Sequence, residues 1–535
     1  MNRLRNILAA SLAFFAPLTV APLVRAQDDH DRVRRFAEPE VRGTWVTTTA
    51  NTHIRTPKDT AATMRTLREI GLNTVYVETW KNGYTQYPSD VLERLIGVDR
   101  RPDLVPQDPS DPPEVLREGA RDLLLETMIE AHRNQLLYIG WFEYGFMAAH
   151  NTTDNHLRRM KPEWLSQDIN GNTVAPNGFV WMNPLHPEAR RFLLDIILEA
   201  VDRYDMDGVQ LDDRIVWPYV TMGYDPYTRA VYANEHGGKQ PPEDHTDPEW
   251  MAWRAKKVDD YAKQFVSELQ QKRPGLLVSL SPAPYPWCYE HYLLDWPDWA
   301  RQGLWDEYIP QCYRYDYDAF VATWDQQAEN LKRVGGRADV SQMLAGVLTT
   351  GSRPDPVPWS DLERSIRHVR DTGGGGHVWW FSRGVLDEYP EQIKAFYDVE
   401  QSGRAPHPQR LPQWRPEPVA LIANAAGEYR LDDVPVGNYR VIVKQDDRWT
   451  RPMLLRIGPN GRELTMIGSG ESFAAVRNRE GVFERVGDAW VPAEGDGWPP
   501  SVASLPIDSK DVEAVELLVD RRYDMTSELE IPVYD

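Results

Sequence analysis

Short apolar runs alternate with amphipathic segments from Glu40 to about Tyr397. A run of four to eight apolar residues bounded by turn residues is typical of a buried strand, and apolar positions three and four apart are typical of a helix. The expected strands are residues 41–48, 73–79, 136–143, 208–213, 276–281, 307–313, 342–348 and 376–381. The expected helices are residues 57–70, 115–134, 187–204, 248–272 and 360–372.

Eight strands that alternate with helices predict an α/β fold, a (β/α)8 barrel. A doubly wound open sheet is the alternative arrangement of the same elements. No glycine-rich phosphate-binding motif follows the first expected strand, which argues against the nucleotide-binding role of that fold.

The pattern changes at both ends of the barrel region, which is assigned to residues 27–400. Residues 1–26 carry Arg3 and Arg5 before an apolar stretch and end in Val24-Arg25-Ala26, which predicts a cleaved signal peptide. We therefore expect a secreted or periplasmic protein without a membrane span after signal cleavage. Residues 401–418 are rich in proline and arginine and predict a linker. Residues 419–535 alternate apolar and polar positions between turns and predict a small β-sandwich.

The composition narrows the choice of partner. The 535-residue chain has a formal net charge of −21, which argues against nucleic acid as a partner. Its 20 tryptophans and 24 tyrosines offer flat ring faces on which sugars stack, although most such rings lie in cores. A polysaccharide is therefore the expected partner.

Carboxylates follow three of the expected strands. Asp212 and Asp213 end the run Gly208–Leu211, Glu143 ends the run that begins at Leu136, and Glu78 follows Val75-Tyr76-Val77. Catalytic groups of an α/β barrel lie at the carboxyl ends of its strands, so all four are candidates for chemistry. Side chains alternate along a strand, so Asp212 shares a side with Gln210 and Asp213 faces the other way.

Four short motifs at the strand ends carry a family resemblance. They are Gly43-Thr44-Trp45, Trp141–Phe146, Asp207–Asp213 and Pro310–Arg314. Together they resemble the glycosyl-hydrolase-like family 10 over about residues 40–395. The resemblance implies a TIM barrel, export from a bacterial cell and glycoside hydrolysis, with peptidoglycan glycan strands as the substrate class. Residues 427–443 are similar to carboxypeptidase regulatory-like modules, which bind carbohydrate or act as spacers.

Glycoside hydrolysis needs one carboxyl group to protonate the leaving oxygen and a second as nucleophile or base. The Asp-Gly-x-x-x-Asp frame resembles that of retaining barrel glycosidases, which makes Asp212 the expected nucleophile or electrostatic stabiliser. Chitinase-type chemistry is disfavoured because Arg214 stands where that family has a glutamate. Glu143 is the first choice for the acid, since neighbouring aromatic rings would raise its pKa, and Glu78 is the second. Asp213 is retained as a candidate catalytic residue, with a role as sugar ligand or partner of Arg214.

Residues at the other strand ends are expected to bind substrate. They are aromatic rings for stacking and polar groups for hydroxyls, namely Trp45, Glu78, Trp80, Trp141, Gln210, Tyr285, Gln311, Tyr313, Arg314 and Trp380. We expect no cofactor, and no histidine or acidic cluster has the spacing of a metal site. Cys288 and Cys312 could form one disulfide or remain two thiols. A non-catalytic carbohydrate-binding or cell-wall-binding protein on the same scaffold is the alternative function.

Overall fold

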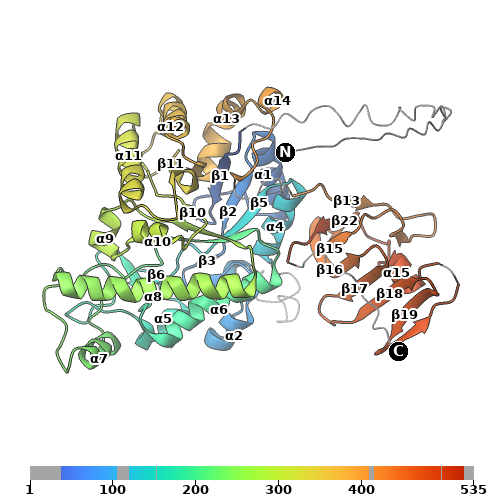
Figure 1. Ribbon diagram of the computed structural model, residues 1–535, viewed down its shortest axis with the longest axis horizontal. Coiled ribbons are helices and arrows are strands. Elements are labelled where there is room, and N and C mark those ends of the chain that lie inside the picture. Colours follow the sequence, from blue (N-terminus) through green and yellow to red (C-terminus); the bar gives the residue numbers. More distant parts are fainter. Residues whose placement is uncertain (1–37, 105–119, 152, 409–414, 496, 523–535) are drawn as a thin grey trace, which may run out of the picture.

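The computed structural model describes residues 38–104, 120–151, 153–408, 415–495 and 497–522. Within these ranges the chain forms an α/β barrel followed by an antiparallel β domain (Figure 1). The expected signal peptide lies outside the described residues, as do the start of the second expected helix and the middle of the expected linker. No helix in the described ranges is long and apolar enough to cross a membrane.

Eight parallel strands build the barrel. They are β1 (Val41–Val46), β2 (Thr74–Glu78), β5 (Leu137–Trp141), β8 (Gly208–Asp212), β9 (Leu277–Ser281), β10 (Glu307–Tyr308), β11 (Leu344–Leu348) and β12 (Gly376–Trp380). Each pairs with the next in this order except β10 with β11, and β12 pairs with β1. Parallel bridges from Tyr308 to Met343 and from Gln311 to Gly346 close the ring between β10 and β11. The predicted closed barrel is confirmed, and an open doubly wound sheet is excluded.

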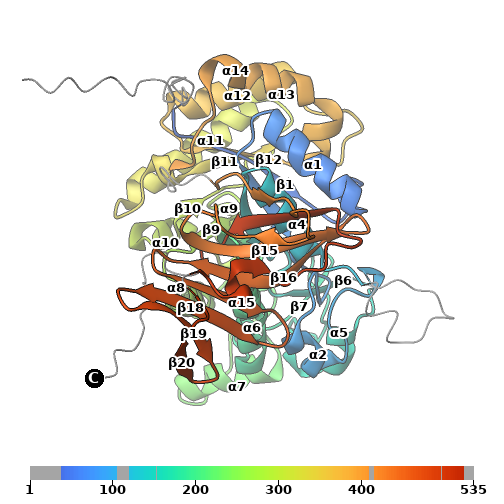
Figure 2. The same cartoon turned by 90° about the vertical axis from the view of Figure 1, so that its right-hand side faces the viewer.

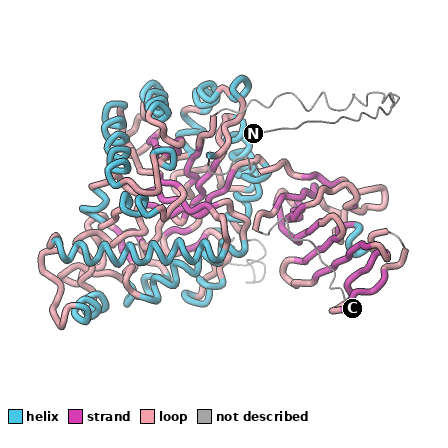
Figure 3. Tube along the Cα trace, in the orientation of Figure 1, coloured by secondary structure: helices cyan, strands magenta, loops and turns pink. Residues whose placement is uncertain are grey.

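Helices surround this ring, as the cyan and magenta segments of Figure 3 show. The main ones are α1 (Pro57–Glu69), α4 (Leu123–Arg133), α6 (Pro187–Arg203), α8 (Pro248–Lys272), α11 (Tyr317–Val334), α12 (Trp359–Asp371) and α13 (Pro390–Tyr397). Their start points follow from local chemistry. Thr56 and Asp59 form a reciprocal capping box at α1, with Pro57 in the first turn. Pro187 and Pro248 occupy the first turns of α6 and α8.

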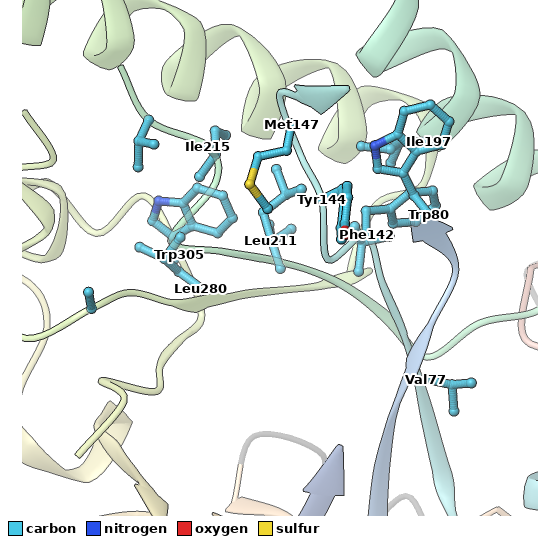
Figure 4. Close-up of a cluster of buried hydrophobic side chains, with 14 of the residues drawn as sticks. Val77, Trp80, Phe142, Tyr144, Met147, Ile197, Leu211, Ile215, Leu280 and Trp305 are labelled. Atoms are coloured by element: carbon cyan, nitrogen blue, oxygen red, sulfur yellow. The ribbon is translucent and has the colours of Figure 1, made fainter. Parts of the chain in front are cut away.

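Strand alternation divides the core into two parts. One set of positions points outward to the helices, including Val77, Leu211 and Leu280, which pack with Phe142, Ile197 and Trp305 (Figure 4). The other set fills the barrel with Trp45, Tyr76, Ile139, Trp141, Leu277, Ile309, Leu344 and Val378. Any polar side chain that lies two positions from one of these residues on the same strand therefore also points into the barrel interior.

One expected strand is shorter than the pattern suggested. Residues 307–313 were expected as a strand, but β10 ends at Tyr308. Pro310 has no N–H to donate to a ladder, and beyond it the chain keeps isolated contacts at Gln311, which bridges to Gly346 and donates its N–H to the carbonyl of Pro282. Cys288 and Cys312 are both buried free thiols, so the disulfide alternative is not formed.

The C-terminal domain is one eight-stranded antiparallel sheet with a small second layer. The sheet contains β13 (Val419–Leu421), β22 (Ala514–Val519), β15 (Gly437–Gln445), β16 (Arg448–Ile457), β17 (Gly461–Met466), β18 (Ser472–Asn478), β19 (Gly481–Val486) and β20 (Ala489–Pro492), in that order. The second layer is the pair β14 (Tyr429–Arg430) and β21 (Ser504–Leu505). Tyr429, Leu431 and Leu505 pack on Val441, Leu455 and Leu517 of the sheet. The C-terminal domain predicted as a small β-sandwich is therefore an antiparallel β domain whose two layers are an eight-stranded sheet and a two-stranded pair.

This domain packs against the barrel on one side, along α4 and the segment that enters β8 (Figures 1 and 2). Ile129 of α4 contacts Ile442 and Leu518 of the sheet. Arg133 pairs with Glu516 at 2.7 Å. These contacts lie at the amino-terminal ends of β5 and β8, whereas the expected catalytic carboxylates lie at the carboxyl ends.

Candidate active site

Three carboxyl groups share the inward parity at the carboxyl end of the barrel. Glu78 follows Tyr76 by two positions, Glu143 follows Trp141, and Asp212 follows Gln210. The pairing continues past the strand ends, since Thr79 N–H donates to Trp141 and Phe142 N–H donates to Gln210. All three carboxyl groups are buried. They come from the adjacent strands β2, β5 and β8, so the barrel brings them together above its aromatic interior.

Arg214 connects Glu143 to the two aspartates. Its guanidinium donates to Asp212 and lies 3.0 Å from Asp213 and 4.0 Å from Glu143. Asp212 also accepts from the backbone N–H of Arg214 at 3.1 Å and from the indole of Trp141 at 3.3 Å. Burial opposes the charge of Arg214, but the surrounding carboxylates outweigh it and raise its pKa, so the guanidinium keeps its charge. One cation thus holds Asp212 and Glu143 on the same side of the barrel mouth.

Lys81 forms a second bridge, between the two glutamates. Its ammonium lies 2.8 Å from Glu78 and 3.0 Å from Glu143. Glu78 accepts further hydrogen bonds from the hydroxyl and the backbone N–H of Thr48, and from Gln86 at 3.4 Å. Fewer donors surround Glu143, since the Lys81 ammonium lies at 3.0 Å and the Arg214 guanidinium at 4.0 Å. The geometry therefore favours a charged Glu78 and a proton on Glu143.

The pKa shifts follow from these surroundings. Burial raises the pKa of Glu143 to about 7, and the negative charge of Glu78 acts in the same direction. Burial also opposes the charge of Glu78, but the Lys81 ammonium and the donors around that carboxylate outweigh it and lower its pKa. Burial raises the pKa of Asp212, while Arg214 opposes the shift. Glu143 can thus hold a proton near neutral pH beside a permanently charged Glu78, which suits a general acid.

Four of the predicted substrate-binding aromatics form one cluster in the barrel mouth. Trp45 lies 6.4 Å from Trp141, 6.2 Å from Tyr313 and 5.8 Å from Trp380, measured between ring centroids. Its indole N–H donates to Gln210 at 2.7 Å, and Gln210 donates to Ser279 at 2.8 Å. Trp45, Trp141 and Gln210 are buried, while Tyr313 and Trp380 are half-buried. The buried members support the site floor, and the half-buried rings are the ones that a ligand could reach.

The remaining predicted polar residues lie on the β8 and β10 side. Gln311 donates to Asp213 at 3.3 Å and to the Ser281 carbonyl at 3.1 Å. This contact explains how Asp213, turned away by strand parity, still joins the site. Arg314 donates to the carbonyl of Tyr313 at 2.9 Å. Tyr285 is half-buried, and its backbone N–H and carbonyl are held by Gln327.

Trp80 does not face the site. Its side chain is fully buried, packs 5.7 Å from Phe192 of α6 and donates to the carbonyl of Gly145 at 3.0 Å. Figure 4 shows it beside Ile197 in the outer core. The expectation that sugars stack on Trp80 is therefore wrong. The chain leaves the barrel sheet after Glu78 and enters the hairpin strand β3 (Trp80–Lys81), so strand parity no longer applies.

Lys81 is the site residue that the sequence analysis missed. A signal for it was present, because a lysine three positions after Glu78 can fold back on that carboxylate. No group of three or more His, Cys, Asp or Glu side chains within the described residues is arranged to hold a metal ion.

Two proteins with established names are similar in sequence to this chain. A Bacillus subtilis (strain 168) protein named Glycosyl hydrolase YngK is 24% identical over 333 residues, which cover 57% of this chain and 58% of that protein. Glycosyl hydrolase DigH from Escherichia coli (strain K12) is 23% identical over 289 residues, 49% of this chain and 59% of that protein. The chain thus spans less than two thirds of the length of either relative.

Among solved structures, the glycoside hydrolase domain of PgaB (BpsB) from Bordetella bronchiseptica superposes with a TM-score of 0.48 and 13% identity, over 68% of this chain and 99% of that one. The family model described as Glycosyl hydrolase-like 10 matches residues 40–350, more than half of the chain and the part that supplies Glu78, Glu143 and Asp212. The chain belongs to the glycosyl hydrolase-like 10 family.

Proposed function

We propose that this protein is an exported glycoside hydrolase that cleaves a polysaccharide, with peptidoglycan glycan strands as its substrate. One observation carries the proposal of hydrolysis: Glu143 and Asp212 leave adjacent strands at the carboxyl end of the barrel and share the Arg214 guanidinium. Glycoside hydrolysis uses one carboxyl group as acid and a second in its ionised form, and the Arg214 guanidinium that donates to Asp212 favours the ionised form of that group.

In the proposed reaction, the protonated Glu143 gives its proton to the glycosidic oxygen as the bond to the anomeric carbon breaks. The Asp212 carboxylate faces the positive charge that develops on the sugar ring, as nucleophile or as stabilising anion. A water molecule then adds to the anomeric carbon and returns a proton to Glu143. Arg214 positions the Asp212 carboxylate, and Lys81 with Glu78 positions Glu143.

Substrate and location rest on the family and the sequence. The curated relatives carry the name glycosyl hydrolase, and the motifs around Trp141 and Asp212 resemble a family associated with peptidoglycan glycan. The signal-like residues 1–26 support export. The acidic net charge supports a partner other than nucleic acid. The substrate would thus be met outside the cytoplasm.

A non-catalytic glycan-binding protein is the second candidate function. One observation favours it: the side chain of Asp212 is only 2% exposed and is already paired with Arg214. A binding protein would keep the aromatic mouth while its carboxyl groups served only to hold the loops.

Release of reducing ends separates the two functions. The protein is incubated with peptide-free peptidoglycan glycan, chitin and α-glucan, and Asp212→Asn is measured beside it. We expect release from peptidoglycan glycan that falls to background in Asp212→Asn, because an amide neither attacks nor stabilises a cation as a carboxylate does. Pull-down of a glycan without any release would replace the hydrolase by the binding protein, and release from chitin or α-glucan alone would reassign the substrate.

Glu78→Gln should move the alkaline limb of the activity profile to lower pH. The charge of Glu78 raises the pKa of Glu143, so its removal lets Glu143 lose its proton earlier as the pH rises. We expect a shift of about one pH unit in kcat/KM, the size of a strong charge interaction in a buried site. Glu235→Gln, which removes a carboxylate paired with Lys257 on the outer helices, is the matched control and should leave the profile in place. An unchanged profile in Glu78→Gln would remove Glu78 from the control of the acid.

A further inference from the structure

An exposed tryptophan stands beside the barrel mouth. Trp287, the first residue of α9 (Trp287–Tyr292), keeps 45% of its surface exposed, more than any other tryptophan among the described residues. It follows β9 by a short loop and so belongs to the carboxyl-end face of the barrel. Figure 1 shows α9 on the side of the barrel away from the C-terminal domain.

The ring of Trp287 is fixed from behind by other rings. His291, one helical turn later, stacks on it with centroids 4.4 Å apart and planes 21° apart. Tyr292 meets it at 5.5 Å and 64°. The His291 ring nitrogen contacts the carbonyl of Trp287 at 3.0 Å, and Tyr219 packs on both His291 and Tyr292. An indole with one face covered and its position fixed presents its other face at little entropic cost.

This aromatic platform, made of Trp287, His291, Tyr292 and Tyr219, is joined to the catalytic loop. The backbone N–H of Trp217, three residues after Arg214, donates to the carbonyl of Tyr292 at 3.1 Å. The Tyr292 hydroxyl accepts from Asn177 at 3.0 Å. Burial raises the pKa of Tyr292 to about 12, and the charge of Asp213 reaches it in the same direction. The platform therefore borders the Asp213 side of the carboxylate cluster.

We propose that Trp287 is an outer sugar-binding subsite, on which a pyranose ring of the polysaccharide stacks at a position beyond the sugars flanking the cleaved bond. This subsite rests on the proposed function, because it assumes that the polysaccharide runs from the Glu143 and Asp212 pair toward α9. The C–H bonds on one face of a pyranose match the electron-rich face of the indole, and the covered back of the ring keeps that face in place. Trp287 thus extends the binding site along the chain without touching the reacting atoms.

Chain length is the variable that tests this subsite. Steady-state kinetics on short and long fragments of the cleaved glycan are compared for the wild type, Trp287→Ala and Trp287→Phe. We expect Trp287→Ala to raise KM for long chains about tenfold, the size of one lost aromatic contact, and to leave short chains unaffected. Trp287→Phe should recover most of the affinity. Trp490→Ala, in β20 of the C-terminal domain, removes a half-buried tryptophan far from the mouth and should leave both substrates unaffected.

Binding to the inactive Asp212→Asn protein gives a second readout that needs no hydrolysis. Retardation in gels that contain long glycan should weaken about tenfold when Trp287→Ala is added to Asp212→Asn. If the wild type cleaves glycan and Trp287→Ala changes neither long-chain KM nor retardation, the subsite is wrong and the proposed function stands. If the wild type cleaves nothing but Trp287→Ala weakens retardation, the subsite stands and hydrolysis fails. An equal loss on short and long chains, or no binding by any variant, overturns the subsite.

Discussion

Glu143→Gln is expected to lower kcat on the cleaved glycan by about 10²- to 10⁴-fold, the usual contribution of a positioned general acid. Glutamine keeps the size of the side chain and its contact with Lys81 but has no proton to give to the glycosidic oxygen. Reducing-end release under saturating substrate measures the effect. Glu188→Gln, which changes a carboxylate that accepts from Trp164 on the outer surface of α6, is the matched control and should retain full activity.

The pH profile of the wild type belongs to the same prediction. Because burial raises the pKa of Glu143 to about 7, the acid form is present below that pH and is lost as the pH rises through it. Activity that depends on Glu143 as acid must therefore fall on the alkaline side of about pH 7. A profile that stays flat well above pH 7, or a Glu143→Gln variant with normal kcat, would exclude Glu143 as the acid.

Folding stability provides a check that does not require substrate. A carboxyl whose pKa is raised in the folded state binds its proton more tightly there, so its contribution to stability is present at low pH and is lost as the pH rises from its ordinary value of 4.5 to about 7. Glutamine has no such dependence. The stability of Glu143→Gln relative to the wild type should therefore increase between pH 5 and pH 8, measured by thermal unfolding. No change in that difference would mean that Glu143 is already ionised at pH 5.

The alternation of residues along the strands explains why most of the site was predictable. Asp212 and Gln210 share a side of β8, and Glu143 and Trp141 share a side of β5. Once a barrel is predicted, alternation is enough to place these side chains on its inner side. The same reasoning failed for Trp80 because this residue already belongs to the hairpin strand β3 and not to the barrel sheet. Lys81 was not identified because its bridge between two glutamates depends on the hairpin β3, which the hydrophobic pattern does not reveal.

The contact between the two domains was the least predictable part of the fold. A sequence rich in proline and arginine suggested a linker over residues 401–418, yet Arg415 is buried against the barrel. Its role depends on Asp205 and Asp207, which lie more than 200 positions earlier and belong to the turn before β8. Pairs this distant in the chain leave no periodic signal, so only the folded arrangement identifies them.

Arg415 is the buried cation whose removal is expected to cause a large loss of folding stability. Its guanidinium lies 2.7 Å from Asp205 and 2.9 Å from Asp207, and it also donates to the carbonyl of Val519 in β22. Arg440 of β15 lies 3.3 Å from Asp205 and donates to the ring of His132. These charged groups are almost fully buried. Burial opposes the charge of Asp207, but Arg415 and His132 outweigh it and hold its pKa well below the usual range.

Arg415→Met should destabilise the protein by about 3–5 kcal/mol, the cost of leaving buried carboxylates without their main cation. Urea unfolding followed by tryptophan fluorescence measures the loss at pH 7. The loss should shrink as the pH falls below about 4, because a depressed aspartate pKa adds stability only above its ordinary value, and that contribution disappears when the carboxylates take up protons. Arg430→Met, which removes an exposed cation paired with Asp432 in the same domain, should change the stability far less, because water screens an exposed ion pair. Equal stability losses in the two variants would show that the domains are held by the contact of Ile129 with Ile442 and Leu518 rather than by the buried charges.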